Sequence, residues 1–338
     1  MHLECLMKEK IILIAFGTII GLLGAFGLFL LRSPHGEGVE FENVDEFRQA
    51  LQDPRGNGRY RRPDGSLPFV AVIESSPSDD IIYTLRPHLN DNFTGVNVKT
   101  NSLGMRSPER PTEKAPNVYR IALMGDSFAF GWGVEQDKGF AQVMEDSLNS
   151  LCKGINRFEV LNFGIPGYAT FQEVALFQER ALQFKPDAVL FFFVENDFDF
   201  PFFIKDKSNS NALMRSLSLG ALEGSESQKV RRELLRGRDP VSSFIKLDEV
   251  ARQEGVVAFL AVNPRKNWRA ILKKLSPLRD KTSIRFIEFG DKFERIVADN
   301  RYTDSDMNLP NDPHPTALRH RIYGELLAQE IGQALSCE

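Results

Sequence analysis

The stretch that decides the fold is Val118-Tyr119-Arg120-Ile121-Ala122-Leu123-Met124-Gly125-Asp126-Ser127. The apolar run Val118–Met124 is of strand type, and Gly125 breaks it directly before Asp126 and Ser127. A serine just past the C-terminal end of a buried strand lies at the edge where open α/β sheets bind ligands. Gly-Asp-Ser is also an ordinary strand-to-helix turn, so a nucleophilic role for Ser127 requires a base and oxyanion donors elsewhere in the chain.

Apolar strand-like runs alternate with helical stretches from Val118 to the C-terminus. The predicted strands are Val118–Met124, Phe158–Asn162, Ala188–Val194, Val256–Val262 and Ile284–Phe289. The predicted helices are Lys138–Leu151, Phe171–Phe184, Val241–Gln253, Asn267–Lys274, Lys292–Ala298 and Thr316–Leu335. Continuous apolar strands such as Phe191-Phe192-Phe193-Val194 are typical of a parallel sheet covered by helices on both faces. The pattern predicts the α/β class, with a doubly wound parallel sheet in three layers, α/β/α.

Residues 11–31 contain no charged side chain, and as a helix these 21 positions would span roughly 32 Å, close to the hydrocarbon thickness of a bilayer. We therefore predict a transmembrane helix at 11–31. A cleaved signal peptide is the competing interpretation, but the apolar region is longer than usual for one and no Ala-x-Ala-like site follows it. Lys8 and Lys10 precede the segment, which predicts a cytoplasmic N-terminus at 1–10 and a periplasmic or extracellular location for the rest.

Two other regions lie outside the alternating pattern. Residues 32–117 are rich in proline and glycine, and we interpret them as a linker followed by a small region with short strands at Phe69–Glu74, Ile81–Leu85 and Val96–Thr100. Residues 205–240 form a polar insertion, rich in serine and arginine, after the end of a strand. The insertion is compatible with a lid over the site or with a surface excursion.

Composition excludes several function classes. The chain has 338 residues, 42% hydrophobic and 26% charged, with a net charge of −4, and its basic residues are scattered among acidic ones. We therefore predict no nucleic-acid partner. The five histidines and three cysteines lack the spacing of metal ligands, and Gly131-x-Gly133 is too short for a dinucleotide-binding loop. The sequence thus predicts neither a metal nor a cofactor.

Three further stretches follow strand ends and would meet Ser127 at one edge of the sheet. Gly164 follows the second strand and offers a backbone N–H, while Asn196 follows the third and offers a side-chain amide. Asp312 and His314 lie beyond the fifth strand, at the start of the last helix. These are the groups that acyl transfer needs. His314 would deprotonate Ser127, Asp312 would orient the imidazole, and the N–H groups of Ser127 and Gly164 with the Asn196 amide would hold the oxyanion.

These motifs resemble a known family. Gly125-Asp126-Ser127-Phe128, Gly164, Asn196-Asp197 and Asp312-x-His314 are similar, in order, to the blocks of the SGNH (GDSL-type) hydrolases, a flavodoxin-like superfamily of serine esterases, lipases, thioesterases and carbohydrate O-acetyl hydrolases or transferases. The resemblance covers about residues 118–333, and it implies an SGNH hydrolase domain over 118–338. The stretch from Asn101 to Arg106 resembles one that precedes the serine block in membrane-anchored bacterial members.

The resemblance implies that Ser127 is the nucleophile, that Gly164 and Asn196 are oxyanion donors and that His314 is the base. Two positions depart from the family's pattern. The family's acid usually lies three residues before the histidine, where this chain has Asn311, whereas Asp312 lies two before it. Val194 stands where glycine is common, two residues before Asn196.

The function that follows is a membrane-tethered extracytoplasmic serine esterase or O-acyl (acetyl) transferase acting on an acylated carbohydrate or lipid of the cell envelope. A lysophospholipase or thioesterase is an alternative. The chain has many phenylalanines near the site, and such an enzyme would need a longer apolar groove. A second alternative is a scaffold subunit of an envelope polysaccharide machine that retains these residues for structure only.

A disulfide between Cys152 and Cys337 is also predicted. The helix after the serine ends near Leu151 and the helix after the histidine ends near Leu335, so both run from the active-site edge to the opposite edge. In a flavodoxin-like winding these helices lie side by side on one face, which brings the two cysteines together. An oxidising compartment would let the bond form.

Overall fold

A computed structural model describes Arg61 and residues 65–153, 157–199, 201–206, 209–215 and 236–337. The predicted cytoplasmic N-terminus at 1–10, the predicted membrane helix at 11–31 and most of the linker lie outside these residues. Among the helices within the described ranges, none has the length and the apolar character needed to cross a bilayer.

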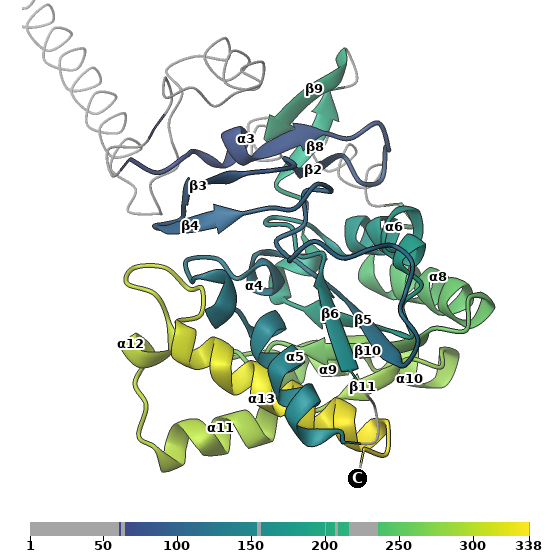
Figure 1. The fold of residues 1–338 in the computed structure, drawn as a ribbon, viewed down its shortest axis with the longest axis vertical. Coiled ribbons are helices and arrows are strands. Elements are labelled where there is room, and N and C mark those ends of the chain that lie inside the picture. Colours follow the sequence, from purple (N-terminus) through teal and green to yellow (C-terminus); the bar gives the residue numbers. More distant parts are fainter. Residues whose placement is uncertain are drawn as a thin grey trace, which may run out of the picture. The chain divides into compact units, whose positions relative to one another are not determined.

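The core of the fold is a five-stranded sheet in which every neighbouring pair of strands is parallel. Its strands are β5 (Val118–Gly125), β6 (Arg157–Asn162), β7 (Ala188–Phe193), β10 (Val257–Val262) and β11 (Arg285–Ile287). They lie in the order β11-β10-β7-β5-β6 (Figure 1). Read from β6, this is the 2-1-3-4-5 order of flavodoxin-like folds, in which the chain switches direction beside the first strand. The prediction of a parallel α/β sheet is confirmed.

Helices cover both faces of the sheet. One face packs against α6 (Thr170–Glu179), α8 (Pro240–Gln253), α9 (Trp268–Leu275) and α10 (Pro277–Lys281), and the other against α5 (Phe140–Leu151), α11 (Gly290–Asp299) and α13 (Ala317–Ala334). Strand β5 shows why both faces are apolar. Ala122 and Met124 point into the first core, and Ile121 and Leu123 point into the second.

Residues 65–117 contribute short elements to the first of these two cores. They form α3 (Phe69–Val72), the antiparallel pair β1 (Ile73–Ser75) and β2 (Tyr83–Leu85), and the antiparallel pair β3 (Asn90–Phe93) and β4 (Val96–Lys99). The predicted strand Phe69–Glu74 is wrong over its first four residues. Pro68 begins a single helical turn there, in which the Ala71 N–H donates to the Pro68 carbonyl at 3.0 Å.

The described part of the polar insertion contains a hairpin of β8 (Phe203–Asp206) and β9 (Asn209–Arg215). Strand β9 lies near β1, so this part of the insertion is next to the N-terminal strands, although the two pairs form separate sheets (Figure 1). Residues 216–235 lie outside the described ranges, and a lid function for the insertion stays a prediction.

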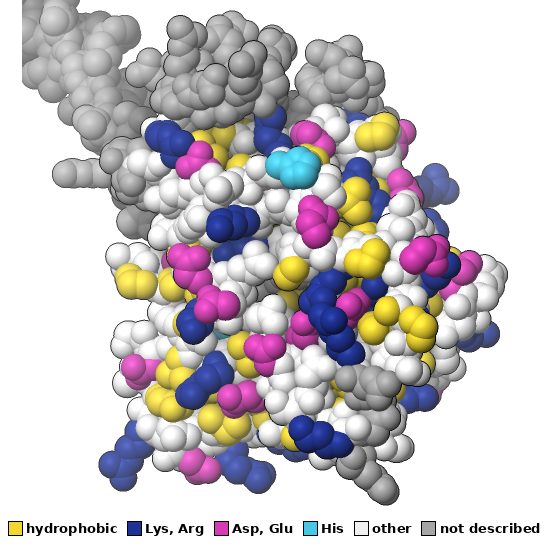
Figure 2. All heavy atoms as spheres, in the orientation of Figure 1, with side chains coloured by type: hydrophobic (Ala, Val, Ile, Leu, Met, Phe, Trp, Pro, Cys, Tyr) yellow, Lys and Arg dark blue, Asp and Glu magenta, His cyan; other side chains and the backbone are white. Residues whose placement is uncertain are grey.

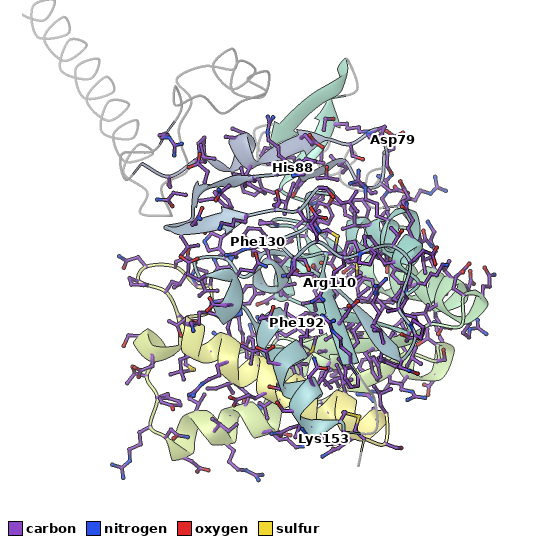
Figure 3. The ribbon with its side chains drawn as sticks, in the orientation of Figure 1. Asp79, His88, Arg110, Phe130, Lys153 and Phe192 are labelled. Atoms are coloured by element: carbon purple, nitrogen blue, oxygen red, sulfur yellow. A yellow bond between two sulfur atoms is a disulfide. The ribbon has the colours of Figure 1, made fainter. Side chains whose placement is uncertain are left out.

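Helices α5 and α13 lie side by side on one face of the sheet (Figure 1). They approach so closely that a Cβ atom on Gly324 would lie 2.6 Å from the Cβ atom of Val143. Beyond their ends, Cys152 and Cys337 form a disulfide with a Cα–Cα distance of 4.8 Å (Figure 3, beside Lys153). The predicted bridge is confirmed, and it lies at the opposite end of both helices from the serine and histidine loops.

Replacing Cys152 with serine should lower the free energy of unfolding by up to about 4–5 kcal/mol, because the bridge closes a long loop and removes chain entropy from the unfolded state. The two cysteines are 185 residues apart in sequence. Urea titration of the oxidised wild type, the Cys152→Ser variant and the Cys152→Ser/Cys337→Ser variant measures the effect. Both variants should match the reduced wild type, and a loss below about 1 kcal/mol would contradict the expectation.

Candidate active site

Ser127 is held at the junction between β5 and the one-turn helix α4 (Ser127–Phe130). Asp126 is the N-cap of this turn, and its Oδ1 accepts the Phe128 N–H at 2.9 Å. Gly131 ends the turn in the left-handed region, at φ +84°, where a residue without a Cβ is favoured. Ser127 is therefore the first residue of a capped turn, and its side chain is 7% exposed.

The structure brings together the three residues predicted to carry the chemistry. The Ser127 Oγ lies 2.7 Å from the His314 Nε2, and the His314 Nδ1 lies 2.5 Å from the Asp312 Oδ1. The two ring nitrogens thus contact the hydroxyl and the carboxylate on opposite sides of the imidazole. This is the arrangement in which a histidine takes a proton from serine while a carboxylate fixes its tautomer.

The loop before α13 explains why Asp312, and not Asn311, contacts the imidazole. A short bridge pairs Asn308 with Pro315, and the Leu309 N–H donates to the His314 carbonyl at 2.9 Å. Asn311 occupies the tip of this turn at φ +57°, a left-handed conformation that asparagine tolerates. Asp312 folds back from the tip, and its Oδ1 also accepts the His314 N–H at 2.9 Å.

Asp312 has a third donor that the sequence did not indicate. The Trp132 Nε1 donates to the Asp312 Oδ2 at 3.1 Å, and the indole stacks on the His314 ring with centroids 4.9 Å apart. Burial of Asp312 acts to raise its pKa, but the hydrogen bonds and charge of His314 and the Trp132 bond outweigh burial, so the pKa lies below its usual value. The carboxylate is therefore ionised at neutral pH.

Trp132→Phe should lower kcat about 3- to 10-fold with little change in KM, because the ring stack on His314 remains while one hydrogen bond to the Asp312 carboxylate is lost. Trp268→Phe is a matched control. Trp268 lies on α9, and its Nε1 also donates to a carboxylate, the Glu294 Oε1 at 2.8 Å. This bond does not involve Asp312 or His314. Steady-state kinetics on an activated ester measures both variants. Equal rates for the two would show that Trp132 does not position Asp312.

Two of the three predicted oxyanion donors lie beside the serine. Ser127 opens α4, so its N–H is one of the donors that a helix start leaves without an intrahelical partner. Asn196 lies in the 3-10 turn η3 (Glu195–Phe198), and one of its amide hydrogens goes to the Asp126 Oδ2 at 2.8 Å. The Nδ2 of Asn196 carries a second hydrogen that this bond does not use. Asp126 therefore ties the amide to the serine turn.

The third predicted donor, Gly164, is placed differently from the expectation. Its backbone packs on α4 so closely that a Cβ atom would lie 2.3 Å from the Phe130 backbone nitrogen, so only glycine fits. However, its N–H donates to the Asn162 Oδ1 at 2.9 Å. Asn162 is buried and its amide donates to the Ala129 carbonyl at 2.8 Å. Gly164 is close to the serine turn, but in this structure its N–H is already bonded within the chain.

Asn196→Ala should lower kcat by about 10²- to 10³-fold, the usual effect of removing one oxyanion donor. KM should change little, because the bond is strongest in the tetrahedral intermediate. Asn97→Ala removes an exposed amide that donates to the Asn90 Oδ1 and serves as the control. A reduction of kcat no larger than that of Asn97→Ala would show that Asn196 is not an oxyanion donor.

Three carboxyl groups are buried behind the serine turn: Asp126, Asp197 and Glu173. Burial raises the pKa of each, and mutual repulsion raises those of Asp197 and Glu173 further. Asp126 also accepts bonds from Phe128 and Asn196, and these oppose the increase. Burial and mutual repulsion therefore favour the neutral forms of Asp197 and Glu173, whereas the bonds that Asp126 accepts favour its ionised form.

Arg106, at the end of the stretch that begins at Asn101, braces the loop after α4. Its buried guanidinium donates to the carbonyls of Phe130 at 3.1 Å, Gly131 at 2.5 Å and Val134 at 2.6 Å, and it lies over the Phe130 ring. Burial lowers its pKa to about 10. Because Trp132 lies in this loop, Arg106 helps to place the indole against Asp312. The sequence showed the motif but not its target, since the two are far apart in the chain.

The aromatic side chains around the site are largely buried. Phe128, Phe130 and Phe203 are at most 3% exposed, while Phe198 and Phe202 are half-buried and pack against the core. Within the described ranges, no group of three or more His, Cys, Asp or Glu side chains is arranged to hold a metal ion. The face of the molecule in Figure 2 mixes basic and acidic side chains.

No protein-family model matches the chain, and no curated protein sequence matches it. Solved structures with a similar fold include a lipase/acylhydrolase from Enterococcus faecalis, at 16% identity and a TM-score of 0.41, covering 64% of this chain and 96% of that one. A catalytic mutant of Axe2, an acetylxylan esterase from Geobacillus stearothermophilus, has 14% identity and a TM-score of 0.41, covering 63% and 94%. The acetyl xylan esterase AlAXEase has 16% identity and a TM-score of 0.43, covering 64% and 99%.

Proposed function

We propose that the chain is an SGNH-type serine esterase that hydrolyses short acyl esters, such as acetyl groups on a carbohydrate or lipid of the cell envelope. The observation that carries the proposal is the continuous line of contacts from the Ser127 Oγ through the His314 ring to the Asp312 Oδ1.

The reaction runs in two steps. The Ser127 Oγ attacks the ester carbonyl while His314 Nε2 takes its proton, and the tetrahedral oxyanion forms next to the Ser127 N–H and the Asn196 amide. The protonated imidazole then gives the proton to the leaving alcohol, which leaves an acyl-serine. Water attacks the acyl-serine with His314 again as the base, which releases the acid. If a sugar hydroxyl replaces this water, the same steps transfer the acyl group.

The packing around Ser127 favours a short acyl group over a long one. A lysophospholipase or thioesterase needs an apolar groove beside its nucleophile, and the aromatic residues that suggested one are largely buried in the core. Phe130, Phe202 and Phe203 pack against aromatic residues of the N-terminal elements. A small acyl group, in contrast, needs only the exposed side of the site at Asn196.

We also propose that residues 11–31 tether the domain on the outer side of the membrane. The Cys152–Cys337 disulfide supports this location, because such bonds persist in oxidising compartments and are rare in the cytosol. Tethering would raise the local concentration of envelope esters. Alkylation of the single remaining cysteine, Cys5, by a membrane-impermeant reagent in intact cells tests the orientation, and labelling there would contradict it.

The test of the esterase proposal combines labelling with a substrate series. A fluorophosphonate should modify purified full-length protein at Ser127, identified by peptide mass spectrometry. Hydrolysis should be fastest for p-nitrophenyl acetate and fall for the butyrate and octanoate esters. Fastest hydrolysis of the octanoate would favour the lipase-type alternative. Absence of both labelling and hydrolysis would favour the scaffold alternative. If the protein is active, a panel of acetylated glycans would identify its substrate or acceptor.

A further inference from the structure

A cavity of about 330 Å³ lies between the N-terminal strands and the C-terminal part of α6, on the far side of the Gly164 loop. Its walls are mostly apolar and buried, with Leu85 from β2, Phe163 from the loop after β6, Leu176 from α6 and Phe184 from the following 3-10 turn. One water occupies roughly 30 Å³ in the liquid, so the cavity has room for about eleven waters. The cavity therefore has the size and lining of a small-molecule site.

Arg180 is the one charged residue among those that line the cavity. Throughout the described ranges its guanidinium takes part in no hydrogen bond or ion pair, although the side chain is half-buried. The neighbouring residue on α6, Glu179, is bonded elsewhere, since it accepts from the Ser78 hydroxyl at 2.7 Å. An unpaired guanidinium beside an apolar cavity presents a fork of donors that matches a carboxylate or a phosphate.

The cavity is open on the side where Arg180 lies. Leu103 is 46% exposed, Gln183 is exposed as well and Arg180 is half-buried, whereas the other lining residues are buried. The deep end is formed by buried residues, including Asn162 and Leu85. A ligand would therefore enter with its apolar part first and leave its polar end beside the guanidinium. The shape is that of a site for an amphipathic molecule.

We propose that this cavity binds an amphipathic anion, with an apolar body of about eight carbons inside and a carboxylate or phosphate on Arg180. Of the predicted site residues only Gly164 lines the cavity, whereas Ser127, His314, Asp312 and Asn196 do not, so the cavity lies beside the ester site and is not centred on it. The two share a wall, because Asn162 lines the cavity while its side chain bonds Gly164 and the Ala129 carbonyl. Binding does not depend on the esterase activity.

Isothermal titration calorimetry of the full-length protein with octanoate and with octyl phosphate tests the proposal, and octanol and octylamine serve as the neutral and cationic comparisons. At least one anion should bind saturably at one site per chain, and octylamine should not. Arg180→Met keeps the apolar stem and should weaken binding about 10- to 100-fold, the loss expected for one charge-assisted hydrogen-bonded pair. Arg180→Lys keeps the charge and should weaken it less than Arg180→Met.

Two controls separate this site from the rest of the protein. Arg321→Met removes an exposed arginine of α13, which does not line the cavity, and should leave binding unchanged. Ser127→Ala should also bind as the wild type does, so that a failed esterase proposal leaves the result intact. The proposal is overturned if neither anion binds saturably, if octylamine binds as well as octanoate, or if Arg180→Met binds as tightly as Arg321→Met.

Discussion

Replacing Ser127 with alanine is expected to lower kcat for p-nitrophenyl acetate by about 10⁴-fold or more, equivalent to at least about 5.5 kcal/mol of transition-state stabilisation. The variant keeps the oxyanion donors but has no atom that can form the acyl-enzyme. Its fold should be intact, because the cap of α4 comes from Asp126 and alanine is the best helix former. Fluorophosphonate labelling should disappear in the same variant.

Ser150→Ala is the matched control. The Ser150 Oγ donates to the Asp146 carbonyl on the exposed side of α5, far in sequence from the site. This variant should retain kcat within about twofold and should still be labelled. A Ser127→Ala protein that is folded by circular dichroism and retains more than a tenth of wild-type activity would mean that another group carries the reaction.

The second large effect is expected for Asp312→Asn, which should reduce kcat by about 10³- to 10⁴-fold. An asparagine cannot satisfy both of its neighbours. If its oxygen accepts from His314 Nδ1, its amide group faces the Trp132 Nε1–H, and two donors meet. If the amide is reversed, it donates to His314 Nδ1 and fixes the wrong tautomer. In both cases the imidazolium formed during attack loses its negative partner.

Asn311→Gly is the control for Asp312→Asn. Asn311 lies at φ +57°, a conformation that glycine adopts without strain, so this change keeps the turn. It removes the side chain at the position where the family usually has its acid. Its kcat should stay within about threefold of the wild type. The reverse order of effects would assign the acid's role to the neighbourhood of Asn311 and leave Asp312 as a turn residue. Both variants are compared at several pH values on the same ester.

Parts of this fold are predictable because they depend on local pattern and on one topological rule. Continuous apolar runs fix the parallel strands, and the rule that strand ends share an edge brings His314 to Ser127 from 187 positions away. The same rule places α5 beside α13 and so brings Cys152 to Cys337. These inferences need only the order and direction of the strands and helices, and the sequence pattern predicts both.

The parts that sequence did not reveal depend on individual side-chain contacts between distant segments. The N–H of Gly164 was assigned to an oxyanion, but the Asn162 side chain two residues earlier accepts it. The binding of Arg106 to three carbonyls around α4 has no local signature. Strand β3 was missed because Asn90-Asp91-Asn92 is typical of a turn, yet it pairs with β4.

The disulfide would also keep the domain covalently linked after a cut in its backbone. A cut after Lys153 would separate a piece that carries Ser127 from a piece that carries Asp312 and His314, but Cys152 and Cys337 would fall on different pieces and hold them together. A nicked protein should therefore migrate as one species without reductant and as two with it. In that form Ser127 and His314 would belong to two polypeptides that are linked only by the disulfide.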